Sequence, residues 1–271
     1  MKPTRPGLVA VVLAALVAVF LLMPLLAVIP VSFTPKRFLS VPEEVWSLRH
    51  YQSLIDEPEW ARAAGLSVLI GMASAALATA LAFLFSLGIW MLRPRYAGAL
   101  MGLALLPMVA PPVVSALTLY FFLITLGQVN DFVAYDSVPG VILAHMVMIS
   151  PFAVVLITVS LAQIDRRIDL AARVMGAGLF TRIFRVILPN IKFGVLTAFL
   201  LTFVLSWEEI GVTIFITSVD VATLPRLMWM GLRDNIDPAI AAVSVVLIVI
   251  VTAVILTRTA VQVARSRRGE G

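Results

Sequence analysis

The segment QIDRRIDLAARVMGAGLFTRIFRVILP, residues 163–189, decides how this chain is organised. It is the one long charged stretch in the apolar middle of the sequence, and uncharged runs flank it at Ser137–Ile164 and Phe193–Trp207. It holds Arg166, Arg167, Arg173, Arg182 and Arg185. Basic loops between membrane spans face the cytoplasm, so this segment is predicted to be a cytoplasmic loop.

The same segment has a helical pattern. Asp169, Ala172 and Gly176 are spaced i, i+3, i+7 and share one face of a helix. After the acid this face carries only small residues, so another protein could approach its backbone closely. Gly176 and Gly178 let the helix end, and a second short helix is predicted over Leu179–Ile187. The pattern indicates a docking element; the alternative is an ordinary basic loop between two spans.

Composition places the chain in the membrane. It is 61% hydrophobic and 13% charged, with a mean hydropathy of +1.06, whereas soluble domains average about 45–50% apolar and about 25% charged. The absence of cysteine excludes disulfide and thiolate chemistry. The two histidines, His50 and His145, lie far apart, and no lysine follows a Walker A pattern. Any ATP that drives this protein would be bound by another chain.

Hydropathy predicts an all-α membrane protein with six spans, since about 20 apolar residues cross a bilayer. The predicted spans are Gly7–Thr34, Ala63–Leu92, Tyr96–Asn130, Ser137–Ile164, Phe193–Val219 and Pro238–Thr257. The first run is longer than the apolar core of a signal peptide, about 7–15 residues, so it is predicted to be a retained span. In the third span, Pro107, Pro111 and Pro112 should break the helix at mid-membrane, either as a pathway-lining kink or as a structural one.

Charge sets the predicted orientation. With both termini inside, 14 of the 20 basic residues lie on the inner side and 6 on the outer side. The inner ones are Lys2, Arg5, Arg93, Arg95, Arg166, Arg167, Arg173, Arg182, Arg185, Lys192, Arg258, Arg265, Arg267 and Arg268. This asymmetry predicts that both termini are cytoplasmic.

The charged segment resembles the EAA loop of type I ABC importer permeases, in which E-A-A, three residues and G precede a later I-x-L-P. This chain has Leu170-Ala171-Ala172, then Gly176, then Ile187-Leu188-Pro189, which lacks the intervening residue of I-x-L-P. Leu170 stands at the glutamate position with Asp169 before it, which leaves open which carboxylate, if any, meets the partner. The resemblance implies a coupling helix seated in a cleft of the ATPase, using Asp169, Ala171, Ala172, Gly176, Leu188 and Pro189.

Two adjacent carboxylates, Glu208 and Glu209, close an otherwise apolar stretch beside Trp207. Ionisable groups within spans are costly and mark function. About 20 residues of helix from Pro189 place the pair near the outer end of the fifth span. One reading has Trp207, Glu208 and Glu209 lining the substrate pathway; the other makes the acids interfacial, paired with Arg226 or Arg233.

The run LSWEEIGVTIFIT, with the later Thr223-Leu224-Pro225, resembles the fifth span and outer loop of spermidine/putrescine permeases. The resemblance covers roughly Ala63–Thr257. It implies a first span and outer segment over 1–62, a permease domain over 63–257 with its coupling loop at 163–190, and a cytoplasmic tail over 258–271.

The resemblance further implies a non-catalytic permease subunit in the bacterial inner membrane that imports polyamines or related organic cations. Its partners would be a second permease, two cytoplasmic ATPases that use the ATP, and an extracytoplasmic binding protein. No cofactor, metal or nucleic acid is expected on this chain. The alternatives are a permease for another small solute (an amino-acid derivative, phosphonate or metal), a secondary carrier, and a structural subunit without a pathway.

Overall fold

The computed structural model describes residues 7–234 and 236–269, and for residues 234 and 264–269 it describes the backbone alone. Helices form most of these ranges and no strand occurs within them, which confirms the all-α prediction. The chain divides into two compact units, one of residues 1–61 with 228–271 and one of residues 62–227. We call them the terminal unit and the central unit and describe each by itself. Lys2 and Arg5, which support the predicted orientation, lie outside the described residues.

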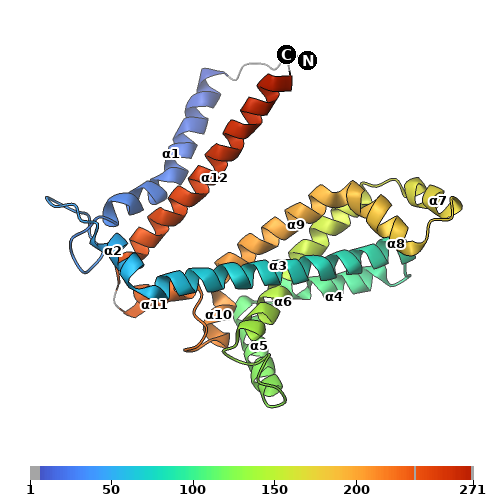
Figure 1. Cartoon of the computed structure of the whole chain (residues 1–271), viewed down its shortest axis with the longest axis horizontal. Coiled ribbons are helices and arrows are strands. Elements are labelled where there is room, and N and C mark those ends of the chain that lie inside the picture. Colours follow the sequence, from blue (N-terminus) through green and yellow to red (C-terminus); the bar gives the residue numbers. More distant parts are fainter. Residues whose placement is uncertain (1–6, 235, 270–271) are drawn as a thin grey trace. The chain divides into compact units, whose positions relative to one another are not determined.

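The terminal unit pairs the two ends of the chain. Its helices are α1 (Leu8–Val31), α2 (Arg49–Asp56) and α12 (Ala239–Gly269), together with the end of α11 (Leu224–Asp234). Figure 1 shows α1 and α12 side by side, and both are in contact. No residue of α1 is buried although its side chains are apolar all round. A helix of this kind is stable only where lipid or another protein surrounds it.

The central unit is a bundle whose two apolar cores share α3 and α6. Its helices are α3 (Pro58–Leu92), α4 (Ala97–Val109), α5 (Pro112–Gly127), α6 (Val138–Ala162), α7 (Arg166–Val174), α8 (Leu179–Thr181), α9 (Leu188–Glu208) and α10 (Gly211–Ile216). One core joins α3, α6 and α9, and the other joins α3, α5, α6 and α10. On α3 the small residues Ala75, Ala78 and Ala82 are at most 1% exposed, so this face lets neighbouring helices pack closely.

The third predicted span is bent. Its halves, α4 and α5, meet at 99° across a break at Ala110 and Pro111, both extended. Proline at 111 and 112 removes two backbone donors and excludes the helical conformation from the residue before each ring, so the helix stops here. Counting this pair as one span, the described residues contain up to six spans. The predicted kink is therefore confirmed.

Two predicted helix boundaries are wrong. The separate short helix expected over Leu179–Ile187 is α8 followed by a π-helical turn, Arg182–Ile187, which runs directly into α9. The wider turn lies where the ring of Pro189 would press on the preceding turn of an α-helix. The fifth span, predicted to reach Val219, ends at Glu208, and α10 begins after the extended Glu209.

The last helix is longer than the predicted last span, Pro238–Thr257. α12 continues unbroken past Thr257, so the predicted boundary at 257/258 corresponds to no break in the helix. The two compact units divide at 227/228 on this side, because α12 packs with α1 and α2. At the other end the units divide at 61/62, and the predicted domain limits stay predictions.

Candidate functional site

The basic loop begins with a well-capped helix. At the start of α7, the Asp165 carboxylate accepts a hydrogen bond from the Arg167 amide at 2.9 Å. At its end Gly176 adopts φ +80°, and the amides of Gly176 and Ala177 donate to the carbonyls of Arg173 and Ala172. This is the Schellman arrangement, which requires a left-handed residue that glycine supplies at no steric cost. The predicted helix end at Gly176 is confirmed.

The face of α7 predicted to be bare is covered by this chain itself. Both Asp169 carboxylate oxygens accept from the Arg182 guanidinium, at 2.7 and 2.6 Å. This bidentate pair draws α7 onto the π-helical turn and leaves Asp169 9% and Ala172 3% exposed. The expectation of an open Asp169–Ala172 face is therefore wrong. The sequence could not show this, since Arg182 lies 13 residues further on.

The opposite face of α7 is open. Residues of an α-helix are 100° apart around its axis, so Leu170, Ala171 and Val174 point away from Asp169 and Ala172. All three are exposed, Val174 to 89%. Two residues of the motif match, Leu170 and Ala171, thus lie on the exposed side, and Ala172 on the inner side. Leu188 is half-buried and Pro189 exposed at the start of α9.

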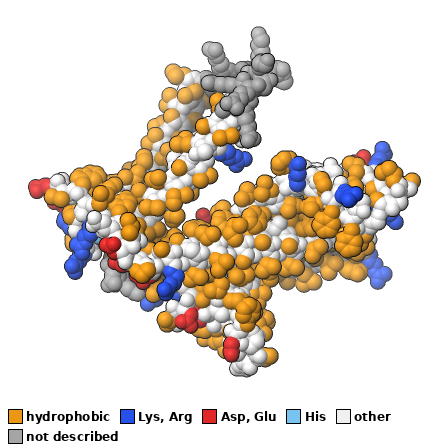
Figure 2. Space-filling view, in the orientation of Figure 1, with side chains coloured by type: hydrophobic (Ala, Val, Ile, Leu, Met, Phe, Trp, Pro, Cys, Tyr) orange, Lys and Arg blue, Asp and Glu red, His pale blue; other side chains and the backbone are white. Residues whose placement is uncertain are grey.

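Apolar exposure continues beyond α7. Phe180 and Phe184, one turn apart, are exposed and their rings stack with centroids 6.5 Å apart. Figure 2 shows Lys and Arg side chains gathered at the end of the molecule that carries α7 and α8. We define the loop face as the exposed apolar residues at the open side and end of α7, Leu170, Ala171, Val174 and Met175. It is an apolar surface with basic side chains around it, which suits a protein partner.

The acid pair lies at the end of α9, as predicted. Glu208 is the last residue of that helix and is exposed, whereas Glu209 is half-buried in the break before α10. One Glu209 oxygen accepts from the Val212 amide at 2.9 Å, which caps α10. Trp207 packs against Phe203, with ring centroids 6.2 Å apart. Among the residues that the structure describes, neither glutamate forms an ion pair.

A buried hydrogen-bond chain holds this break in place. The Thr213 hydroxyl donates to the Glu209 carbonyl at 2.7 Å, so it accepts from Nε2–H of His145 at 2.8 Å. That tautomer leaves Nδ1 of His145 as the acceptor for the Ser206 hydroxyl, also at 2.8 Å. His145 is 1% exposed, so both of its ring nitrogens are satisfied inside the bundle. Through it α6 fixes both sides of the break.

The loop after α10 is fastened by residues whose role the sequence does not reveal. The Asp136 carboxylate accepts from four successive backbone amides, those of residues 218–221, at 2.8 to 3.2 Å. Arg226 donates to the carbonyls of Val221 and Ser218. Its guanidinium therefore binds the backbone of this loop. The predicted alternative, in which Arg226 pairs with Glu208 or Glu209, is wrong.

Asp136→Asn should loosen this loop. Burial disfavours the charged carboxylate, but the four amide donors outweigh it, so the pKa of Asp136 lies below its ordinary value of 3.8. A lowered pKa stabilises the fold above pH 3.8, and this stabilisation is lost as the pH falls through the lower folded value. Asparagine keeps one acceptor oxygen and tolerates the φ of 56°.

Hydrogen exchange at residues 218–221 should therefore be roughly tenfold faster in Asp136→Asn at neutral pH, because a hydrogen bond to a charged group contributes about 1.5–3 kcal/mol and loss of the charge weakens all four bonds. Asp131→Asn, an exposed acid in the same connection, is the control. Equal protection in Asp136→Asn and the unaltered chain would show that the carboxylate does not hold the loop.

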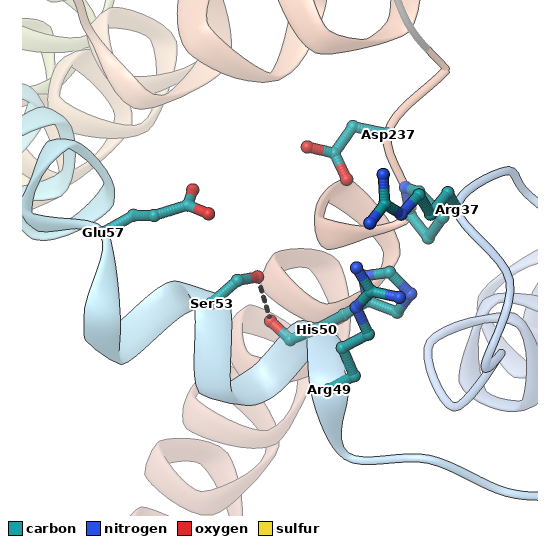
Figure 3. Close-up of a pocket in the computed structure, with 7 residues that line it drawn as sticks. Arg37, Arg49, His50, Ser53, Glu57 and Asp237 are labelled. Atoms are coloured by element: carbon teal, nitrogen blue, oxygen red, sulfur yellow. Dashed lines mark hydrogen bonds between the residues drawn. The ribbon is translucent and has the colours of Figure 1, made fainter.

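The terminal unit contains a polar pocket of about 500 Å³ near α2. In Figure 3 Arg37 and Asp237 point toward one another, Arg49 lies beside them, and Glu57 lies across the pocket. His50 is buried and its Nε2 lies 3.1 Å from the Lys36 carbonyl. The charges of its two arginines and two acids cancel, so the pocket favours neither a cationic nor an anionic ligand. No group of three metal-ligating side chains occurs among the described residues.

The chain is similar to known transport proteins over most of its length. Residues 82–268 match the family described as binding-protein-dependent transport system inner membrane component. A putrescine transport system permease protein, PotI of Escherichia coli K12, is 28% identical over 233 residues, 84% of this chain and 82% of that protein. The spermidine/putrescine permease PotC of Haemophilus influenzae is 26% identical over 237 residues, 88% of this chain and 90% of that protein.

Two further similarities are to transporters named for other substrates. A probable molybdenum ABC transporter permease of Haloferax volcanii is 33% identical over 182 residues, 65% of this chain and 67% of that protein. A bacterial ABC transporter involved in the import of the acidic polysaccharide alginate has a chain with a TM-score of 0.64. It is 15% identical and the match covers 96% of this chain and 99% of that one, so the likeness concerns the fold.

Proposed function

This chain belongs to the binding-protein-dependent transport system inner membrane components, and from this premise we propose that it forms part of the pathway for polyamines or related organic cations. The chain is a permease of the type I ABC importer class. The observation that carries the substrate class is the acid pair. Glu208 and Glu209 stand at a helix break, and within the central unit neither carboxylate forms an ion pair.

A cationic substrate would replace the missing counter-charge. At an effective dielectric constant near 20, two unit charges about 4 Å apart attract by about 4 kcal/mol. Glu208 is exposed, and one oxygen of Glu209 is left over after the Val212 bond. Trp207 is half-buried one residue before the pair and would add a cation–π contact if its ring turned from Phe203 toward the substrate. The polyamine permeases among the relatives support the same class.

A second candidate is import of a molybdenum species, which the relative from Haloferax volcanii favours. If the molybdenum travels as an oxyanion, two unneutralised carboxylates at the pathway would repel it. The two proposals therefore predict opposite effects of removing the negative charge. Removal should slow uptake of a cation and leave or speed uptake of an anion.

The partners are proposed on the same premise. The loop face would receive a cytoplasmic ATPase, and a second permease, carrying its own coupling loop, would complete the pathway and receive the other. An extracytoplasmic binding protein would deliver the substrate, and ATP would be bound by the ATPases alone. Both termini would be cytoplasmic in the inner membrane, which the charge asymmetry of the sequence supports.

The test is uptake by the reconstituted complex with Glu208→Gln, Glu209→Gln and the double variant, normalised to assembled protein. Glutamine keeps the volume and removes the charge, and at position 209 it keeps an acceptor for the Val212 amide. We expect uptake of putrescine or spermidine to fall about tenfold or more in the double variant, corresponding to about 1.4 kcal/mol. Basal ATP hydrolysis should remain.

Glu44→Gln is the matched control, because Glu44 is exposed in the terminal unit and far along the chain from the pair. Unchanged normalised uptake of cations in all three variants would refute the pathway role. Faster uptake of molybdate in the double variant would favour the second candidate instead.

A further inference from the structure

A pocket of about 450 Å³ opens in the central unit where α3, α4, α6 and the start of α7 converge. Its walls are of two kinds. Arg93 and Arg166 supply positive charge. The apolar part of the wall is formed by Ile89, Leu161 and Ile164. All of them belong to one compact unit.

The two arginines have no negative partner in the pocket. Arg166 lies over the Trp90 ring, with its guanidinium carbon 5.0 Å from the centroid, and Arg93 is exposed. No carboxylate lines the pocket. The nearest acids along the chain are engaged elsewhere: Asp165 caps α7, and Asp169 binds Arg182 with both oxygens. Within the described chain the pocket therefore has uncompensated positive charge.

The hydroxyls in the pocket are already satisfied. Thr158 donates to Ser86 at 3.0 Å, and Ser86 donates to the Val154 carbonyl at 3.4 Å. They do not compete for the arginines. A ligand for this pocket would thus be anionic at one end, to meet two guanidinium groups, and apolar at the other, to cover the helix walls.

We propose that this pocket binds the phosphate head group of an anionic phospholipid. Basic pockets between membrane helices are a recognised place for such head groups. Arg93 and Arg166 bind the phosphate oxygens, Trp90 holds Arg166 in place by its ring face, and an acyl chain runs along the apolar wall of α3 and α6. The inference concerns a chain in a membrane and does not depend on which solute is transported.

The test compares lipids bound to the full-length chain, purified in a neutral detergent and supplied with equal amounts of phosphatidylglycerol and phosphatidylcholine. Native mass spectrometry counts the lipids retained. The unaltered chain should retain phosphatidylglycerol over phosphatidylcholine, and Arg93→Gln/Arg166→Gln should lower phosphatidylglycerol retention about tenfold. Arg95→Gln is the matched control, since Arg95 belongs to the same turn, is exposed and does not line the pocket.

Three results would overturn the proposal. The unaltered chain could retain both lipids equally, which requires no variant and so does not depend on whether the double variant folds. Arg95→Gln could lower retention as much as the double variant does, which would indicate general surface charge. Displacement of phosphatidylglycerol by millimolar inorganic phosphate alone would assign the pocket to a free anion instead of a lipid.

Discussion

Val174→Asp, alone or with Leu170→Asp, should abolish association with the ATPase while the permease still folds and reaches the membrane. Val174 is 89% exposed and Leu170 53% exposed, so a carboxylate there stays in water and costs the isolated chain little. In a complex that covers the loop face, the same carboxylate would be buried without a partner, which costs several kcal/mol. We expect at least a hundredfold loss of affinity for the ATPase, about 2.7 kcal/mol.

Co-purification of the ATPase with the tagged permease measures this effect. Gln163→Glu adds a carboxylate at an exposed position of the same loop, before α7, and should leave association intact. Gly176 is a poor site for this test, because its φ of +80° makes any side chain strain the backbone. Normal co-purification and coupled uptake with both aspartates present would refute docking through this face.

Gly194→Ala should separate α6 from α9 and destabilise the central unit. A Cβ at residue 194 would lie 1.9 Å from the Ser160 hydroxyl oxygen and 2.6 Å from its Cβ. Alanine in place of glycine stabilises a helix interior by about 0.5–1 kcal/mol, whereas overpacking costs about 1–3 kcal/mol or more. The clash involves a Cβ that no rotamer can move, so the net effect should be a loss of at least about 2 kcal/mol.

Thermal unfolding of the purified chain checks this expectation. Gly102→Ala on α4 is the control, since a Cβ there has nothing within 4 Å, and its midpoint should not fall. Adding Ser160→Gly to Gly194→Ala removes both clashing atoms and should recover much of the stability. An unchanged midpoint for Gly194→Ala would show that the helices do not pack this closely.

The two sites differ in how much the sequence foretold. The acid pair at the end of α9 followed from counting helical residues onward from Pro189, because helix length depends on local geometry alone. The break that holds the pair was not foreseen, since Val212 and Thr213 belong to the same apolar run as α9. On the loop, the helix and its end at Gly176 were predicted from local signals. Which face of that helix is open was predicted wrongly.

The sequence by itself determined the class of protein, the number of spans, the bend at Pro111 and Pro112, and the position of the basic loop along the chain. These depend on composition, chain stiffness and spacing, which act over a few residues. The tertiary structure alone decided which faces of the helices pack against the rest of the chain and which stay exposed. Asp136 meets amides 82 to 85 residues away, and His145 meets hydroxyls 61 and 68 residues away. In a soluble helix the apolar face reveals the core, but in a membrane lipid and core are equally apolar, so hydropathy cannot tell one face from the other.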